Sequence, residues 1–178
     1  FKDFNSQELA NMLWSFAVFD LRAEVFSSAQ CFQAVESRAA DMELEGFAEL
    51  HQWQLWLREC GMLSSLSATF RDRLFLAFTS HPVKTSQLQQ SVTHRLRAVC
   101  QGVKEEVSTE LGYTLDAHVS WRGYEVAVEV DGPSHFLDRR PTGATILKRR
   151  QLRRLGGLHL FSVPYWEWDD KLNMHAQE

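Results

Sequence analysis

Two alternating stretches joined by a short turn constrain the fold of this chain most strongly. Residues 114–121 and 124–131 each alternate apolar and polar side chains, which is the period of a β-strand. Only the dipeptide 122–123, Arg-Gly, separates the two stretches. This spacing predicts a β-hairpin with a two-residue turn, in which Trp121 pairs with Tyr124.

The predicted hairpin has one apolar face and one charged face. The apolar face carries Leu115, Ala117, Val119, Val126, Val128 and Val130, and the charged face carries Asp116, His118, Glu129 and Asp131. Asp116 falls opposite Glu129, and like charges in that position destabilise a sheet. Three explanations fit: Asp116, Glu129 and Asp131 hold a divalent cation such as Mg²⁺ or Mn²⁺, a Lys or Arg neutralises them, or the face is solvated.

Composition describes a globular protein without a membrane span. The chain has 178 residues, 44% of them hydrophobic and 12% aromatic, enough for one core or for one domain with a helical appendage. It contains no apolar run of about 18 residues and begins with neither Met nor a signal peptide, so we interpret it as a fragment or a processed product. The cysteines, Cys31, Cys60 and Cys100, are scattered, which favours buried thiols in a reducing compartment over disulfides or zinc.

The first 82 residues have the periodicity of helices. Asn5 and Glu8 form a capping-box pattern ahead of the first helix, and further helices are predicted over residues 23–38, 43–59 and 67–78. In the third helix, Trp53 and Trp56 are expected to pack in the core. We interpret residues 1–82 as a fragment of a helical-repeat array that ends at His81-Pro82.

The rest of the chain mixes helices and strands. A long helix is predicted from residue 85 to 111, with Gly112 closing it, followed by the hairpin, a helix over 146–155 and a strand over 158–163. This order is typical of a small α/β sandwich. The predicted fold class is therefore α+β, with a helical-repeat region at 1–82 and an α/β domain at 83–178.

Positive charge is concentrated after the hairpin. The net charge is −4, yet residues 132–164 hold seven Lys and Arg residues against one acid, Asp138. On the predicted helix 146–155, one face carries Arg149, Arg150, Arg153 and Arg154. Together with Arg139, Arg140 and Lys148, these cations are candidate contacts for RNA phosphates, the alternative being a solvated face. Lys148 lies on the apolar side, where it could extend to water or reach the acids of the hairpin.

Residues 86–168 resemble the RAP domain, an RNA-binding domain named for its abundance in apicomplexans. The matching pieces are Val126-Ala-Val-Glu-Val-Asp-Gly-Pro-Ser-His-Phe136, Thr142-Gly-Ala-Thr-Ile-Leu-Lys-Arg-Arg150, Leu155-Gly156 and Val163-Pro-Tyr-Trp-Glu-Trp168. Residues 9–17, Leu-Ala-Asn-Met-Leu-Trp-Ser-Phe-Ala, resemble the octotricopeptide-like repeats that precede RAP domains in algal and alveolate proteins.

The resemblance implies a place of action and a fold. RAP proteins act on organelle RNA, in mitochondria or chloroplasts, in transcript processing, stability or ribosome assembly. Their fold is similar to that of PD-(D/E)XK nucleases such as the very-short-patch-repair endonuclease, in which three acids bind a metal; Asp116, Glu129 and Asp131 match those positions. This chain departs from the nuclease motif because Asp131 stands where the motif has Lys, and Lys148 could substitute for it.

Two main functions follow. The first is a non-catalytic RNA-binding protein of an organelle, with the mitochondrion expected before the chloroplast, working with other proteins of a ribonucleoprotein such as an organellar ribosome. The second is a metal-dependent endoribonuclease, with Mg²⁺ or Mn²⁺ at the three acids and Lys148 or His135 assisting as electrostatic stabiliser or general acid/base. Exposed Trp121, Trp166 or Trp168 could stack on bases. A protein-binding scaffold is the third alternative.

Overall fold

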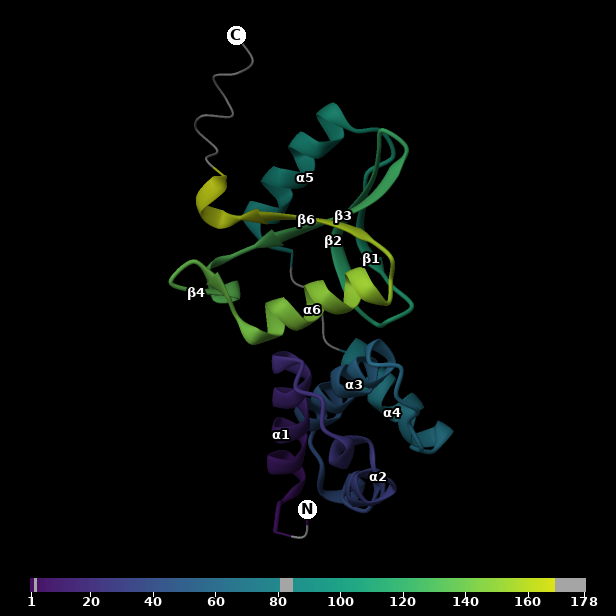
Figure 1. Ribbon diagram of the computed structural model, residues 1–178. Helices are drawn as coiled ribbons and strands as arrows, with labels where there is room; N and C mark the ends of the chain where they lie inside the picture. The colour runs from purple at the N-terminus through teal and green to yellow at the C-terminus, as the bar shows by residue number, and fades with distance from the viewer. Residues whose placement is uncertain (2, 81–84, 169–178) are drawn as a thin grey trace. The chain divides into compact units, whose positions relative to one another are not determined.

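The computed structural model describes residues 1, 3–80 and 85–168, and the chain divides into two compact units (Figure 1). The helical unit comprises residues 1–82 together with residues 146–151, and the α/β unit comprises residues 83–145 and 152–178. Helix α6 (Gly143–Arg154) therefore contributes its middle to the helical unit and its two ends to the α/β unit. The α+β class expected from the sequence is confirmed.

The helices of the helical unit are α1 (Ser6–Phe19), α2 (Ala29–Glu36), α3 (Leu44–Glu59) and α4 (Ala68–Thr79), with 3-10 turns η1 (Glu24–Ser27) and η2 (Ala39–Asp41). Helices α1, α2 and α4 begin at side-chain caps, whereas α3 begins without one. The capping box is confirmed, because the Glu8 amide donates to Asn5 Oδ1 at 2.8 Å and the Asn5 amide donates to Glu8 Oε2 at 2.9 Å.

The single helix predicted over 23–38 is wrong. Residues 24–27 form η1, and α2 begins only after Ser28. The Ser28 hydroxyl accepts the amide of Cys31 at 3.2 Å, so this serine caps a new helix instead of continuing the old one.

The core of the helical unit lies where α1 and α4 pack against α3. Trp53 and Trp56 are fully buried there, as predicted, and the Trp56 indole donates to Asp20 Oδ1 at 2.8 Å. Cys31 is also buried, and burial raises the pKa of its thiol to about 12, so the thiol stays protonated. None of the helices described in the structure is long and apolar enough to cross a membrane.

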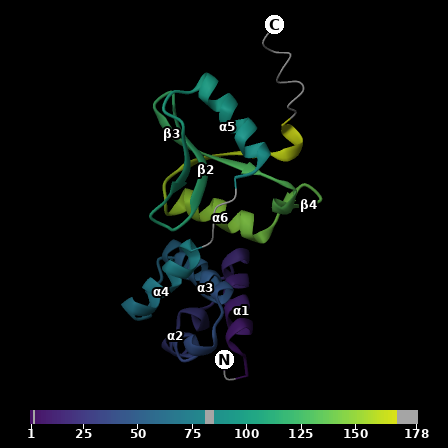
Figure 2. The same cartoon turned by 180° about the vertical axis from the view of Figure 1, so that it is seen from behind.

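The α/β unit contains a mixed sheet with the strand order β1-β2-β3-β6. The strands are β1 (Lys104–Ser108), β2 (Thr114–Trp121), β3 (Tyr124–Asp131) and β6 (His159–Pro164). Strand β2 runs antiparallel to both β1 and β3, and β6 runs parallel to β3, with α6 as the crossover (Figures 1 and 2). Helix α5 (Gln87–Val99) covers one face, where Val92 packs in a core with Ala117, Val119, Val128, Val130 and Val163.

The β2–β3 hairpin has the predicted turn and register. Trp121 pairs with Tyr124 and Ala117 pairs with Val128. The turn residues Arg122 and Gly123 have φ angles of 51° and 83°, the left-handed conformation that two-residue hairpin turns require.

The helix predicted over 85–111 is wrong beyond its middle. Helix α5 ends at Val99, and β1 follows at Lys104. Gly102 has a φ of 67°, which cannot continue a helix, and Gly112, expected to close the helix, has a φ of 86° in the turn between β1 and β2. The four-residue spacing of Val103, Val107 and Leu111 imitates a helix, but pairing with β2 satisfies the backbone as a strand.

Candidate nucleic-acid interface

The carboxyl ends of β3 and β6 lie side by side, because Asp131 is the partner of Pro164 in the parallel ladder. After β3 come the turn η3 (Pro133–His135), the short strands β4 (Phe136–Leu137) and β5 (Arg140–Pro141), and then the start of α6. After β6 comes the turn η4 (Tyr165–Glu167). Two segments that lie about 30 residues apart in the sequence therefore meet at one edge of the sheet, which is the edge where open α/β sheets bind ligands.

Aromatic rings and arginines gather at this edge. Phe136 meets Trp166 with ring centroids 4.4 Å apart, and Tyr165 meets Trp166 at 5.1 Å, both edge to face. The guanidinium of Arg139 lies over the Trp166 ring, 5.5 Å from its centroid. We call Phe136, Arg139, Arg140, Tyr165 and Trp166 the carboxyl-end surface.

The turn between β4 and β5 has an unusual backbone. Asp138 and Arg139 have φ angles of 48° and 64°, which residues other than glycine adopt uncommonly. Leu137 pairs with Arg140 across this turn, and Leu137, Arg139 and Arg140 are exposed. The two-residue turn therefore accepts some strain while it places Arg139 over Trp166, and such strain is concentrated at functional sites.

A buried carboxylate holds His135 beside this surface. Asp131, 2% exposed, accepts a hydrogen bond from the Ser162 hydroxyl at Oδ2, 2.6 Å away. Its Oδ1 lies 3.4 Å from Nδ1 of His135, and that nitrogen is also 3.2 Å from the Thr145 hydroxyl. The His135 side chain is 45% exposed, so its ring is fixed on one side and open to solvent on the other. This arrangement suits a group that donates to, or exchanges protons with, an anionic ligand.

The three acids predicted to share a metal ion are engaged differently. Asp116 Oδ2 accepts the backbone amide of Val130 at 2.7 Å, just past the last regular pair of the hairpin. Asp131 binds Ser162 and faces His135, and Glu129 is 4% exposed. Among the described residues, no group of three or more His, Cys, Asp or Glu side chains is arranged to hold a metal ion. Asp116 and Asp131 therefore already have hydrogen-bond partners within the protein, and a shared metal ion at Asp116, Glu129 and Asp131 stays a prediction.

The arginines of α6 divide into two kinds. Arg153 and Arg154 are exposed, and Lys148 and Arg149 are partly exposed. Arg150 instead packs in the helical unit: its Nε donates to Glu59 Oε2 at 2.9 Å, and its Nη atoms donate to the carbonyls of Val18, at 3.1 Å, and Ala17. The Arg150 side chain is 14% exposed and that of Glu59 is fully buried. Arg150 is thus a structural residue, which corrects its inclusion among the predicted RNA contacts.

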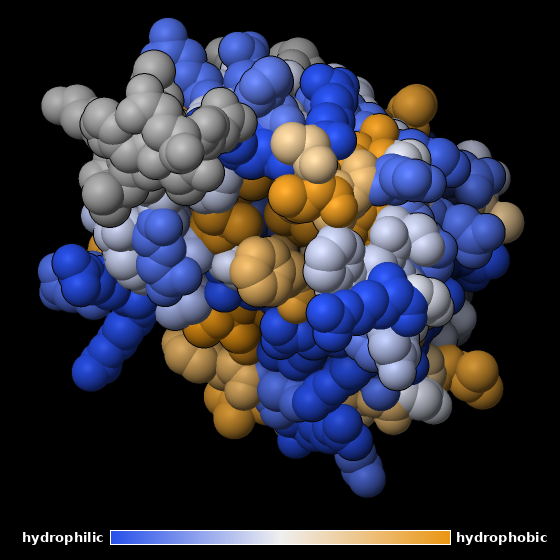
Figure 3. Space-filling model, turned by 90° about the horizontal axis from the view of Figure 1, so that it is seen from above, coloured by the Kyte–Doolittle hydropathy of each residue, from blue (hydrophilic) through white to orange (hydrophobic). Residues whose placement is uncertain are grey.

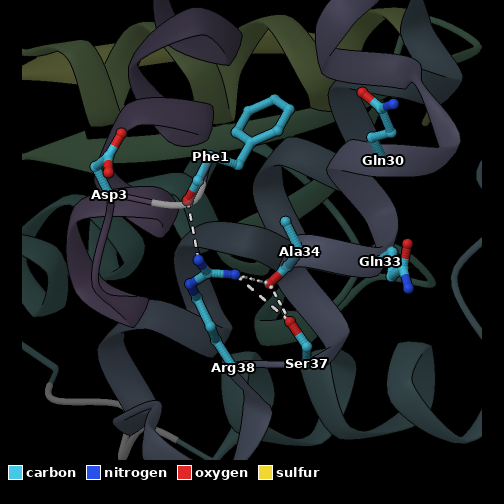
Figure 4. A pocket seen from close by; sticks show the side chains of 7 residues that line it. All are labelled: Phe1, Asp3, Gln30, Gln33, Ala34, Ser37 and Arg38. Carbon is cyan, nitrogen blue, oxygen red and sulfur yellow. Dashed lines mark hydrogen bonds between the residues drawn. The ribbon is translucent and has the colours of Figure 1, made fainter.

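Two pockets lie in the helical unit. One of about 690 Å³ is formed around Arg38, whose guanidinium donates to the backbone carbonyls of Phe1 and Ala34 and so is committed to the fold (Figure 4). Another of about 590 Å³ carries carboxylates. Burial, then the nearby charge of Glu45, raises the pKa of Glu49 in this pocket to about 7, against the opposing hydrogen bond from Gln7. Neither pocket offers an unengaged cation for a phosphate.

Part of the carboxyl-end surface was not predicted. Phe136 and Tyr165 lie within the RAP-like pieces but were not among the predicted stacking residues, and the pairing of Arg139 with Trp166 depends on the parallel ladder between β3 and β6. Trp168, a predicted stacking residue, instead packs beside the core under α5, where its indole donates to the Ser91 hydroxyl at 3.0 Å.

Comparison with known proteins agrees with the RAP resemblance. Residues 128–178 match the family model of the RAP domain, so the predicted resemblance is confirmed there. The chain is similar to a protein of Oryza sativa subsp. japonica described as "RAP domain-containing protein, chloroplastic", with 27% identity over 186 residues. The match covers 94% of this chain but only 28% of that relative, so the chain spans little more than a quarter of its length.

Proposed function

We propose that this chain is an RNA-binding protein of an organelle and that single-stranded RNA binds at the carboxyl-end surface of the α/β unit. The observation that carries the proposal is the Arg139 guanidinium stacked 5.5 Å from the centroid of Trp166, on a strained turn beside Arg140. Every residue of this surface falls within the 128–178 RAP match.

The chemistry of the surface suits an unpaired strand. Arginines contact phosphates through paired N–H groups, and aromatic rings stack on bases of any sequence. Tyr165 is 39% exposed and Trp166 partly exposed, so base stacking has access to them. His135, held by Asp131, adds a donor at the edge of the same surface. Arg153 and Arg154 extend the positive charge along α6 and supply affinity that does not depend on sequence.

The experiment compares two double charge reversals. Arg139→Glu with Arg140→Glu alters the proposed surface, and Arg22→Glu with Arg58→Glu makes the same change at exposed arginines of the helical unit. Binding of a labelled single-stranded RNA is measured across a series of salt concentrations. The first pair should weaken binding about tenfold or more and make the salt slope shallower by about 1.4, the value for two lost phosphate contacts on a single strand. Equal effects of both pairs would contradict the proposal.

The organelle and the RNA are finer parts of the proposal. The RAP resemblance is compatible with the mitochondrion, which we expected first, and with the chloroplast, and the name of the rice relative supports the chloroplast. A role in transcript processing or in an organellar ribosome, among other proteins, is compatible with the proposed binding. Sequencing of RNA crosslinked to the native protein separates these cases: ribosomal RNA supports an assembly role, and messenger or intron RNA supports processing.

A metal-dependent endoribonuclease is the second hypothesis and has weaker support. The RAP resemblance and the Asp131–His135 contact favour it, and the dispersed engagement of the acids disfavours it. Purified protein and an Asp131→Asn variant are incubated with labelled transcript and Mn²⁺. Cleavage that disappears in the variant would support the nuclease, and equal cleavage in both would indicate contamination.

A further inference from the structure

A second group of aromatic side chains lies at the opposite end of the same sheet, around the β2–β3 turn. Trp121, Tyr124 and Phe161 are 44%, 60% and 59% exposed. The Tyr124 ring meets the ring of exposed His159 edge to face, with centroids 5.3 Å apart. The Arg122 guanidinium lies over the Trp121 ring, 5.6 Å from its centroid. We call Trp121, Arg122, Tyr124, His159 and Phe161 the hairpin-tip surface.

Strand register places these rings on one face of the sheet. Trp121 is the partner of Tyr124, while His159 and Phe161 are the partners of Val126 and Val128. Because side chains alternate along a strand, the rings lie on the same face of the sheet as the core residues that α5 covers. The rings themselves are exposed, so α5 does not cover this end of the face. Figure 3 shows that the face seen from above carries hydrophobic side chains at the surface among hydrophilic ones.

Exposed rings of this size require an explanation. A single exposed aromatic is ordinary, but adjacent ones leave a large apolar area in water. The charge around them is positive: Arg122 lies directly on Trp121, whereas the neighbouring acid, Glu125, alternates to the other face and pairs with His118 at 3.2 Å. Exposed rings beside an arginine, with the nearby glutamate on the other face, are better suited to bind a nucleic acid strand, which carries negative charge and planar bases, than an apolar protein surface.

We propose that the hairpin-tip surface is a second stacking site for single-stranded RNA, occupied by the same strand that binds the carboxyl-end surface. Strand β6 connects the two, beginning at His159 and ending at Pro164, beside Tyr165. At about 3.3 Å per residue this strand spans roughly 17 Å, which corresponds to about five nucleotides stacked at ~3.4 Å. The inference rests on the proposed function and adds that the bound strand is long enough to reach both ends of the sheet.

The test uses RNA length. Oligoribonucleotides of about three residues, too short to reach both ends of the sheet, and of about fifteen residues are titrated into the chain at fixed salt. Trp121→Ala with Tyr124→Ala should weaken binding of the long RNA about 30-fold or more, since each base stacked on an aromatic ring contributes about 1–3 kcal/mol, and should leave binding of the short RNA and the salt slope nearly unchanged. Trp121→Phe with Tyr124→Phe should restore binding, and Glu125→Gln, on the other face, should have little effect.

The outcomes separate this site from the proposed function. If the alanine pair binds both RNAs like the wild type while the Arg139/Arg140 pair is weakened, the hairpin-tip site is refuted and the RNA-binding function stands; the tip would then be a surface for another macromolecule. If the wild type binds neither RNA, both proposals fail. Thermal unfolding of each variant serves as the folding control, and an unchanged midpoint is expected because the replaced rings are exposed.

Discussion

In the helical unit Trp53 and Trp56 face inward, whereas in the α/β unit Trp121 and Trp166 reach the surface. Trp53 and Trp56 have no exposed area, while Trp121 is 44% exposed and carries Arg122 over its ring. The arginines follow the same division, since Arg150 is enclosed by the helical unit and Arg139 lies over exposed rings. Composition alone treats these residues as equal. Their environment assigns the first set to stability and leaves the second set accessible for the binding that we propose, and that division can be tested.

Truncation of a buried indole should give the largest effect. Trp56→Ala removes a fully buried ring and its hydrogen bond to Asp20, so we expect the free energy of unfolding to fall by about 4 kcal/mol. Trp121→Ala, at an exposed ring, should change it by less than about 0.5 kcal/mol. Urea denaturation of both variants measures the difference. Similar losses at the two positions would remove the distinction between core and surface aromatics.

Loss of the Arg150 side chain should come next. Arg150→Ala takes the guanidinium away from the fully buried Glu59 side chain and from two carbonyls, so unfolding should become easier by about 3 kcal/mol. Arg153→Ala, about one turn further along on the exposed side of α6, is the matched control and should change the free energy of unfolding by less than about 0.5 kcal/mol. If Arg153→Ala destabilised the protein as much as Arg150→Ala, the division of the α6 arginines would be wrong.

Local patterns predicted those features that depend on neighbouring residues. The β2–β3 turn, its register and the capping box at Asn5 were correct because turn length and side-chain period determine them. Strand β1 was missed because Val107, together with Val103 before the strand and Leu111 after it, follows a four-residue spacing, and only pairing with β2 selects a strand.

The candidate site was less predictable because it is assembled from distant segments. Arg139 and Trp166 meet only through the parallel β3–β6 ladder, which no local period encodes. The helical wheel gave Arg150 the same rank as Arg153, since a wheel carries no information about Glu59, which is 91 residues away. Alternation placed Asp116, Glu129 and Asp131 on one side, but it could not predict that the carboxylate of Asp116 accepts the Val130 amide.

Charge reversal on the outer side of α6 should affect binding and leave folding intact. Arg153→Glu with Arg154→Glu should weaken RNA binding about tenfold at low salt, equivalent to about 1.4 kcal/mol of binding free energy. The reason is that two exposed cations, which attract the RNA phosphates in our proposal, become anions. The loss should shrink as salt rises, since screening weakens both attraction and repulsion. Fluorescence anisotropy at two salt concentrations provides the measurement. A loss that is independent of salt would indicate a folding defect instead of a lost phosphate contact.

The smallest effect should come from Glu49, in the acidic pocket of the helical unit. Burial raises the pKa of this carboxyl from 4.5 to about 7, so the folded chain holds the proton more tightly than the unfolded chain. Between pH 4.5 and about 7 the unfolded chain therefore loses this proton first, and the stability of the wild type should fall as pH rises through that window. Because the pocket is open to solvent, we expect the free energy of unfolding to fall by only about 1 kcal/mol.

Glu49→Gln should remove this loss, making the variant more stable than the wild type at pH 8 and nearly equal to it at low pH. Glu110→Gln, at an exposed acid of the α/β unit, is the control and should not alter the pH dependence. Urea titrations of the wild type and the two variants at pH 5 and pH 8 provide the measurement. If Glu49 were an ordinary surface carboxyl, all three proteins would show the same difference in unfolding free energy between the two pH values.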